Sequence, residues 1–226
     1  MVTRPARLLA AALAVAALAT PMRARAQGSD CLVIETFADS QIGQFPLGWK
    51  ARKDAGKVAY TVQEEAGLRF LRAMSSGLGI QAGREYEWDL TKYPVLAWSW
   101  RPRLFPQGAD ERDSSKNDSA LAVYMTVPYS RISGPKAVKY IWSERVPVGT
   151  RLSSNMGLTQ VLVLRTGPNS VRDQWVEERS NVLEDYTRLF GEPPAVKPAG
   201  IAVLTDSDDT RSRAEGDYAN FRVCRS

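Results

Sequence analysis

The stretch Val95-Leu96-Ala97-Trp98-Ser99-Trp100-Arg101 decides the fold class, because large apolar side chains alternate in it with small or charged ones. Successive side chains of a strand point to opposite faces, so Trp98 and Trp100 share one face and Arg101 lies on the other. Large apolar groups in register are more typical of a core than of a surface on which sugars stack. The stretch therefore predicts a strand with one buried face.

Short segments of similar character recur along the chain, each bounded by Gly, Pro, Asp or Ser. About ten such strands favour an all-β fold, an antiparallel β-sandwich of the jelly-roll type, over an α/β fold. The predicted strands are Cys31–Phe37, Val58–Gln63, Gly67–Ala73, Val95–Arg101, Ala120–Val127, Lys139–Ser143, Thr159–Arg165, Trp175–Arg179, Gly200–Asp206 and Tyr218–Cys224.

One segment has a helical pattern. Asn181 is suited to cap its start and Gly191 to end it, and Tyr186 belongs to an apolar stripe between them. These signals predict one short helix near residues 181–190, which would close one end of the sandwich.

Residues 1–26 have the pattern of a cleaved secretory signal. A basic head precedes the unbroken apolar run Leu8–Ala19, and Ala24-Arg25-Ala26 then offers the small residues that signal peptidase accepts. The run is shorter than the roughly 20 residues that a bilayer-spanning helix needs. We therefore expect one mature domain over residues 27–226, without a transmembrane anchor, in the periplasm or outside the cell.

Removal of this segment changes the charge balance. The chain carries 30 Lys and Arg against 25 Asp and Glu, a net charge of +5. Residues 1–26 contain four arginines and no acidic residue, so the mature domain would keep a net charge of only +1. A nearly neutral domain without a recognisable binding motif argues against a nucleic-acid partner.

The chain contains no histidine. Catalytic triads of Ser-His-Asp, Cys-His nucleophiles and zinc sites that require imidazole are therefore excluded. The Glu-x-Asp-x-Glu pattern of β-sandwich glucanases, which pairs carboxyl groups across the cleaved bond, is also missing. We favour a non-catalytic binding protein. The alternatives are a polysaccharide-active enzyme that uses carboxylate or Tyr/Arg chemistry, and an assembly or scaffold subunit of the cell envelope.

Aromatic and basic side chains on several predicted strands suit a ligand with polar rings. Tyr124, Tyr140 and Trp142 could join Arg101 on one face, where aromatic rings stack on sugars and the guanidinium binds hydroxyls or acids. We predict that these four residues bind a glycan or another envelope component.

Positive charge is concentrated in residues 131–151, which contain Glu144 as their single acidic residue. This patch could contact an anionic envelope polymer. The simpler interpretation is that these basic side chains form a face that is exposed to water and has no partner. Its basic residues are Arg131, Lys136, Lys139, Arg145 and Arg151.

The loop that begins at Asp206 concentrates carboxylates, the hard oxygen ligands that Ca²⁺ prefers. We predict a structural Ca²⁺ there, held by Asp206, Asp208, Asp209 and Asp217. The alternative is an acidic turn whose side chains cap its own backbone amides.

Two cysteines are present, Cys31 and Cys224. Two cysteines in an oxidising compartment usually pair, so we predict a disulfide that joins the first strand to the last.

Several motifs extend over nearly the whole mature chain. They are Phe45-Pro46-Leu47-Gly48-Trp49, Tyr93 to Arg101, Gly108 to Arg112 with Asn117-Asp118, Lys139 to Trp142, Glu184-Asp185-Tyr186 with Phe190 to Pro194, and Ile201 to Asp208. In these motifs the chain resembles a family of secreted bacterial proteins known as domain-of-unknown-function family 3047. Asn117 stands where that family commonly has a second acid, which weakens any shared metal site at that loop.

The resemblance implies a galactose-binding-like jelly roll. Domains of that kind commonly bind carbohydrate on one sheet or loop edge and often hold a structural Ca²⁺ near the termini. By position, Glu35, Asp39 and Asp217 would be its candidates here. The family has no assigned activity, and a fold does not by itself determine function.

Overall fold

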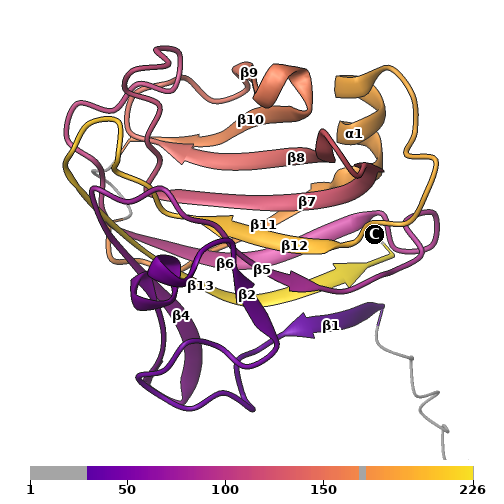
Figure 1. Ribbon diagram of the computed structural model, residues 1–226. Coiled ribbons are helices and arrows are strands. Elements are labelled where there is room, and N and C mark those ends of the chain that lie inside the picture. Colours follow the sequence, from indigo (N-terminus) through magenta and orange to yellow (C-terminus); the bar gives the residue numbers. More distant parts are fainter. Residues whose placement is uncertain (1–29, 168–171, 226) are drawn as a thin grey trace, which may run out of the picture.

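The computed structural model describes residues 30–167 and 172–225, which form two β-sheets packed face to face (Figure 1). The predicted signal segment, residues 1–26, lies outside the described residues. Two short 3-10 helices, η1 and η2, and one α-helix, α1, complete the described chain. Their bounds are Asp54–Ala59, Asn155–Gly157 and Val182–Phe190.

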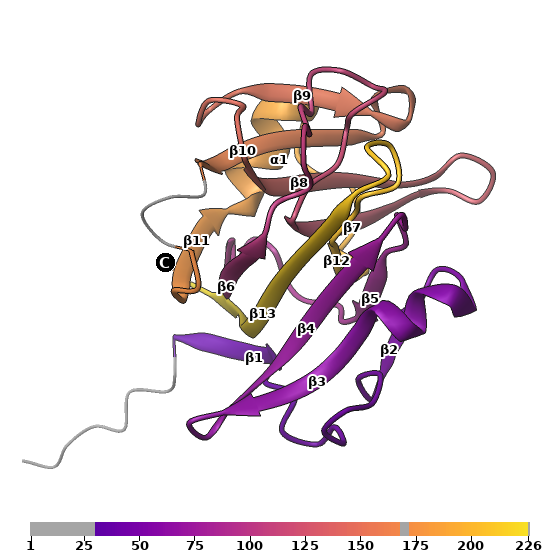
Figure 2. The same ribbon diagram turned by 90° about the vertical axis from the view of Figure 1, so that its left-hand side faces the viewer.

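The first sheet has six strands, and β13 is at its centre (Figure 2). In spatial order they are β11 (Val176–Asn181), β6 (Val95–Leu104), β13 (Arg213–Cys224), β4 (Leu68–Ser76) and β3 (Tyr60–Glu65), with β1 (Cys31–Glu35) also paired to β13.

The second sheet has seven strands. In spatial order they are β2 (Trp49–Ala51), β5 (Ala82–Glu85), β12 (Gly200–Leu204), β7 (Leu121–Ser130), β8 (Gly134–Ser143), β10 (Thr159–Thr166) and β9 (Arg151–Ser154).

The predicted β-sandwich is confirmed, and each of the ten predicted strands has a counterpart. The prediction missed β2, β5 and β9, which have only three or four residues and so offer little periodicity. The strand pair β8–β10 is parallel, in contrast to the predicted antiparallel arrangement. Strand β10 lies between β8 and β9 and is antiparallel to β9.

Aromatic side chains fill the space between the sheets. Trp98 and Trp100 of β6 are fully buried, as their spacing predicted. The Trp100 ring lies 5.7 Å from that of Trp142, and the Trp98 ring lies 5.5 Å from that of Tyr140. Because Tyr140 and Trp142 belong to β8, these contacts join the two sheets directly.

Helix α1 confirms the predicted segment and its caps. The Asn181 side chain accepts a hydrogen bond from the Glu184 backbone at 3.1 Å, and Gly191 ends the helix with a φ of 84°. The helix follows β11 of one sheet, and its Asp185 accepts a hydrogen bond from Tyr140 of the other (Figure 1). It therefore closes the sandwich on that side. No helix among the described residues has the length and apolar character to cross a membrane.

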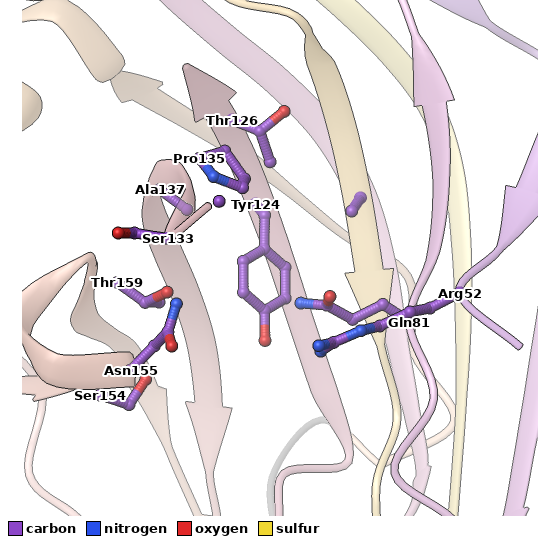
Figure 3. A pocket seen from close by; sticks show the side chains of 12 residues that line it. Arg52, Gln81, Tyr124, Thr126, Ser133, Pro135, Ala137, Ser154, Asn155 and Thr159 are labelled. Atoms are coloured by element: carbon purple, nitrogen blue, oxygen red, sulfur yellow. The ribbon is translucent and has the colours of Figure 1, made fainter. Parts of the chain in front are cut away.

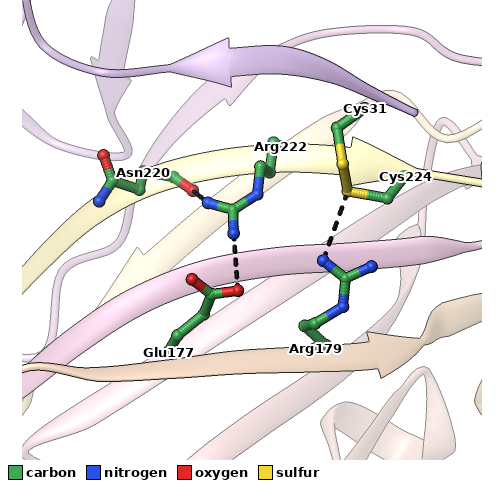
Figure 4. Close-up of a disulfide and its surroundings, with 6 residues drawn as sticks. All are labelled: Cys31, Glu177, Arg179, Asn220, Arg222 and Cys224. Carbon is green, nitrogen blue, oxygen red and sulfur yellow. Dashed lines mark hydrogen bonds and ion pairs between the residues drawn. A yellow bond between two sulfur atoms is a disulfide. The ribbon is translucent and has the colours of Figure 1, made fainter. Parts of the chain in front are cut away.

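The predicted disulfide between Cys31 and Cys224 is present (Figure 4). The two residues are register partners in β1 and β13, and they are separated by 193 positions in the sequence. Arg179 of β11 donates to the Cys224 sulfur at 3.8 Å, so the disulfide also contacts β11, the strand on the far side of β6. The disulfide therefore holds the N-terminal edge strand to the centre of the sheet.

We expect the Cys31→Ser/Cys224→Ser double variant to lose about 2–5 kcal/mol of unfolding free energy, because so long a loop strongly restricts the unfolded chain. Urea denaturation followed by tryptophan fluorescence measures the loss, with the reduced wild-type protein as a second sample. Equal midpoints for oxidised and reduced protein would show that the bond adds no stability.

Candidate functional site

The outer face of the seven-stranded sheet carries a row of residues that are opposite one another on neighbouring strands. Tyr124 of β7 is the register partner of Lys139 in β8 and of Ala202 in β12. Ala202 is in turn the partner of Gly83 in β5, and Gly83 is the partner of Lys50 in β2. Side chains on this row point away from the aromatic core because their neighbours in each strand point into it.

A pocket of about 460 Å³ opens over Tyr124 (Figure 3). Arg52 and Gln81 lie on one side of the Tyr124 ring, and Ser154, Asn155 and Thr159 lie on the other. Its full lining is Arg52, Gln81, Tyr124, Thr126, Ser133, Gly134, Pro135, Ala137, Ser154, Asn155, Thr159 and Ala202.

Small residues on neighbouring strands leave room for this pocket. Ala137 and Ala202 flank the strand that carries Tyr124, and Gly83 lies one strand further along. A Cβ atom on Gly83 would lie 3.1 Å from the Ile201 carbonyl oxygen and 3.3 Å from the Ala202 Cβ. The backbones of β5 and β12 therefore approach closely, and a larger side chain at position 83 would have to displace one of them.

Lys139 lies beside Tyr124 with only 5% of its surface exposed. Its ammonium nitrogen is 5.6 Å from the centre of the Tyr124 ring. Burial would lower the pKa of Lys139, but Tyr124 and the carboxylates of Asp206 and Glu111 outweigh that effect and raise the pKa above its ordinary value. Lys139 is therefore a buried permanent cation behind the pocket.

Tyr124 is held in its protonated form. Burial raises the pKa of its phenol, and the opposing effect of Lys139 is smaller. At neutral pH, Tyr124 can donate a hydrogen bond but has no tendency to remove a proton from a ligand. The Tyr-beside-Arg arrangement of the enzyme alternative does occur, since Tyr124 and Arg52 line the same pocket. As protonated groups, however, both act as hydrogen-bond donors.

The four predicted ligand-binding residues do not share one face. Tyr140 and Trp142 are fully buried between the sheets, where Tyr140 bonds to Asp185 and the Trp142 indole donates to the Gly167 carbonyl. Arg101 lies on the outer face of the other sheet. Of the four, Tyr124 alone lines the pocket, so the expectation of a common aromatic face is wrong.

Arg101 forms a closed ionic network. Its guanidinium contacts Asp217 at 2.7 Å and Glu65 at 2.8 Å. It also stacks over the rings of Phe70 and Trp175, at 5.1 Å and 4.6 Å from their centres. Arg101 is only 4% exposed, and its guanidinium is fully occupied by these partners. It therefore links strands of the sheet and is not available to a ligand.

The predicted calcium loop meets a second acidic loop. Asp118, Asp206 and Asp208 place one carboxylate oxygen each within 4.8 Å of one another. The two loops also cap each other, because Asp118 accepts from the backbone of Asp209 and Thr210 while Asp206 accepts from the backbone of Ser119. Three oxygens at this spacing could hold a cation such as Ca²⁺.

Two of the predicted ligands lie outside this cluster. Asp209 is exposed and contributes only its backbone amide to Asp118. Asp217 is on the six-stranded sheet, fully buried and paired with Arg72 and Arg101, so its assignment as a ligand of this loop is wrong. Its place is taken by Asp118.

The set implied near the termini is also not assembled. Glu35 accepts hydrogen bonds from the Trp49 indole at 2.9 Å and from Arg84 at 2.7 Å, and Asp217 is paired with arginines. Asp39 is exposed. Glu35 therefore links β1 to β2 and β5, and the expected cation site of Glu35, Asp39 and Asp217 is wrong.

Comparison with protein families assigns the chain to a family. The model of the family described as "Protein of unknown function (DUF3047)" matches residues 48–222. The chain belongs to this family. None of the curated proteins matches it.

Several solved structures have a low overall similarity to this DUF3047 protein. A meso-active thermostable cellulase derived from Cel12A of Rhodothermus marinus has 13% identity and a TM-score of 0.41, over 77% of this chain and 95% of that one. The carbohydrate-binding module CtCBM11 has 8% identity and a TM-score of 0.41, over 89% and 99%. The cellulose-specific module CBM28 has 13% identity and a TM-score of 0.38, over 78% and 86%. Similarities at this level carry no argument about what the protein does.

Most residues that line the DUF3047 pocket were not found from the sequence. Arg52 follows β2, Gln81 precedes β5, and Asn155 belongs to η2, so no spacing along the chain connects them. The one available signal was alternation in β7 and β8, which places Tyr124 and Lys139 on the outer face once the core face is known.

We expect Ca²⁺ to stabilise this DUF3047 protein through Asp118, Asp206 and Asp208. At 100 times the dissociation constant, the gain is about 2.7 kcal/mol, and Tm rises by roughly 5–10 °C. Thermal scans with Ca²⁺ or EDTA measure it. Asp208→Asn should abolish the shift, whereas Asp209→Asn, the matched control outside the cluster, should keep it. Equal loss in both variants, or no shift in wild type, would contradict the site.

In EDTA, we expect the unfolding free energy to fall between about pH 4 and pH 7. Burial raises the pKa of Asp206 to about 7, above its unfolded value near 4. The folded state therefore holds this proton more tightly, and its stabilising effect is lost as pH rises through that window. Denaturant titrations of wild type and Asp206→Asn at several pH values test this, and parallel profiles would contradict it.

Proposed function

We propose that this protein binds a glycan of the cell envelope in the pocket around Tyr124, in the periplasm or outside the cell. The observation that carries the proposal is the lining of that pocket. Amide and hydroxyl side chains surround a tyrosine on a floor of small residues, and the lining contains no carboxylate. The location rests on the predicted secretory signal.

The hydrogen-bonding chemistry of the pocket suits sugar hydroxyls. Gln81 and Asn155 each offer a donor and an acceptor, and so does the hydroxyl of Thr159. The Thr126 hydroxyl donates to the Gly200 carbonyl and can therefore accept a hydrogen bond from a ligand. A sugar hydroxyl likewise both donates and accepts, so each can meet such groups in either sense. Arg52 adds a planar donor that binds neighbouring hydroxyls or a carboxylate. Such convergent polar groups around an aromatic ring are typical of a small-molecule site.

Binding without turnover fits the protonation states better than the enzyme alternative does. Cleavage of a glycan requires a group that removes a proton or attacks the sugar. Tyr124 stays protonated because burial raises its pKa, and Lys139 stays charged. Glu111 and Asp206 interact with Lys139, but neither lines the pocket. We therefore propose that the bound glycan leaves the protein intact.

We expect Gln81→Ala to weaken glycan binding about 3- to 10-fold, the usual effect of one lost hydrogen bond to a ligand. Retention on immobilised cell-wall polysaccharides and peptidoglycan, followed by titration with the retained glycan, measures the change. Gln63→Ala, on β3 of the other sheet, is the matched control and should bind like wild type. Retention of no glycan by wild type, or equal weakening in both variants, would refute the pocket.

Chromatography of the glycan after prolonged incubation with the protein tests the absence of turnover. Unchanged chain length is expected. Shortened products that disappear in Tyr124→Phe would instead support the enzyme alternative.

A further inference from the structure

The pocket around Tyr124 continues into two further hollows. One of about 560 Å³ lies against the β7–β8 hairpin and includes Tyr129 and Arg131. Another of about 200 Å³ lies over β2, β5 and β12. Thr126 lines all three, Pro135 joins the first to the hairpin hollow, and Ala202 joins it to the third. These shared walls place the three hollows side by side along the sheet, and together, as one groove, they extend further than a single sugar ring requires.

The floor of the groove is low because its residues are small. Gly83 and Ala202 follow one another across β5 and β12, and Gly200 and Ala199 lie next to them. Gly200 has a φ of 154° and could not carry a side chain, since a Cβ atom there would lie 2.1 Å from the Arg84 carbonyl oxygen. The floor over β5 and β12 is therefore low, and the exposed Lys50–Glu85 pair lines the same hollow.

The available charge in the groove is positive. Lys50 and Glu85 pair with each other at 2.6 Å, and Arg84 pairs with Glu35 at 2.7 Å, so these four groups are largely neutralised. Arg52 and Arg131 remain, both exposed and in different hollows. Within residues 30–167 and 172–225, no acidic side chain forms an ion pair with either of them.

From these observations we propose that the ligand is a linear acidic polysaccharide that occupies the whole groove. Its hydroxyls bind the neutral side chains around Tyr124, and Arg52 and Arg131 pair with carboxylate or sulfate groups on different sugar units. This proposal rests on the glycan-binding function above and specifies its ligand class. Charge complementarity selects an acidic chain, because two unpaired guanidiniums lie along a groove whose single lining acid is already paired.

Affinity electrophoresis with pairs of polymers tests the proposal. Each pair consists of an acidic polysaccharide (polygalacturonate, alginate, hyaluronate, chondroitin sulfate) and its neutralised form, in which carboxyl groups are reduced or esterified and sulfates removed. At least one acidic member should bind more than 10-fold tighter than its neutralised form, and its affinity should fall as salt is raised. A hexasaccharide of that polymer should bind more tightly than the disaccharide.

Arg52→Gln and Arg131→Gln should each weaken binding of the acidic polymer about 3- to 10-fold. Arg131→Gln should leave binding of the neutralised form unchanged, whereas Arg52→Gln, which also removes a donor to sugar hydroxyls, should weaken it less than it weakens binding of the acidic form. Arg213→Gln removes the same charge from the other sheet and should bind like wild type. A single-stranded oligonucleotide is included as a linear polyanion without the sugar-hydroxyl pattern.

The outcomes separate this proposal from the function on which it rests. Binding of neutralised forms as tightly as acidic ones, with dependence on Gln81, would overturn the acidic ligand and keep the glycan site. Equal binding of the oligonucleotide, or equal loss in Arg213→Gln, would show non-specific attraction and also overturn it. Failure of every polysaccharide to bind would overturn both proposals.

Discussion

Aromatic packing across the gap between the two sheets is the constraint on which the rest of the structure depends. Trp100 meets Trp142, and Trp98 meets Tyr140, at ring separations below 6 Å. Buried aromatic side chains remove about 150–250 Å² each from solvent, and such pairs add roughly 0.5–1.5 kcal/mol beyond that burial. Once these four side chains point inward, the alternation of β6 and β8 requires that their neighbours Arg101 and Lys139 point outward.

The two outward-facing cations are stabilised in different ways, and this difference locates the site. Arg101 is paired with Asp217 and Glu65 and covered by aromatic rings, so no room is left for a ligand. Lys139 is also buried, but its neighbour across the strand pair is Tyr124, whose partner on the other side is the small residue Ala202. The six-stranded sheet therefore carries a closed ionic network on its outer face, whereas the seven-stranded sheet carries an open pocket.

The sequence was sufficient for the fold but not for the site, for reasons that can be stated residue by residue. The alternation of large and small side chains identified the core face of β6, because Trp98 and Trp100 are two residues apart and therefore lie on the same face. In β8 the same pattern could not identify the core face, because Ile141, which points outward, is also buried in a second apolar cluster. Tyr140 and Trp142 were therefore assigned to the wrong side. Asp217 follows the acidic loop closely along the chain, but β13 carries it to the other sheet.

The charged residues near the two ends of β7 have opposite signs. The cluster of Asp118, Asp206 and Asp208 lies where β7 begins, and Arg131 lies just beyond its end. The ten residues of β7 span roughly 33 Å at about 3.3 Å per residue. The Debye length at physiological ionic strength is only about 8 Å, so each end is screened from the other. A cation at the acidic end would hold two loops together without changing the attraction of an anionic chain to Arg131. Substitutions in the acidic cluster and at Arg131 can therefore be interpreted separately, whereas Tyr124, three residues into β7, interacts with Asp206 and is closer to the acidic end.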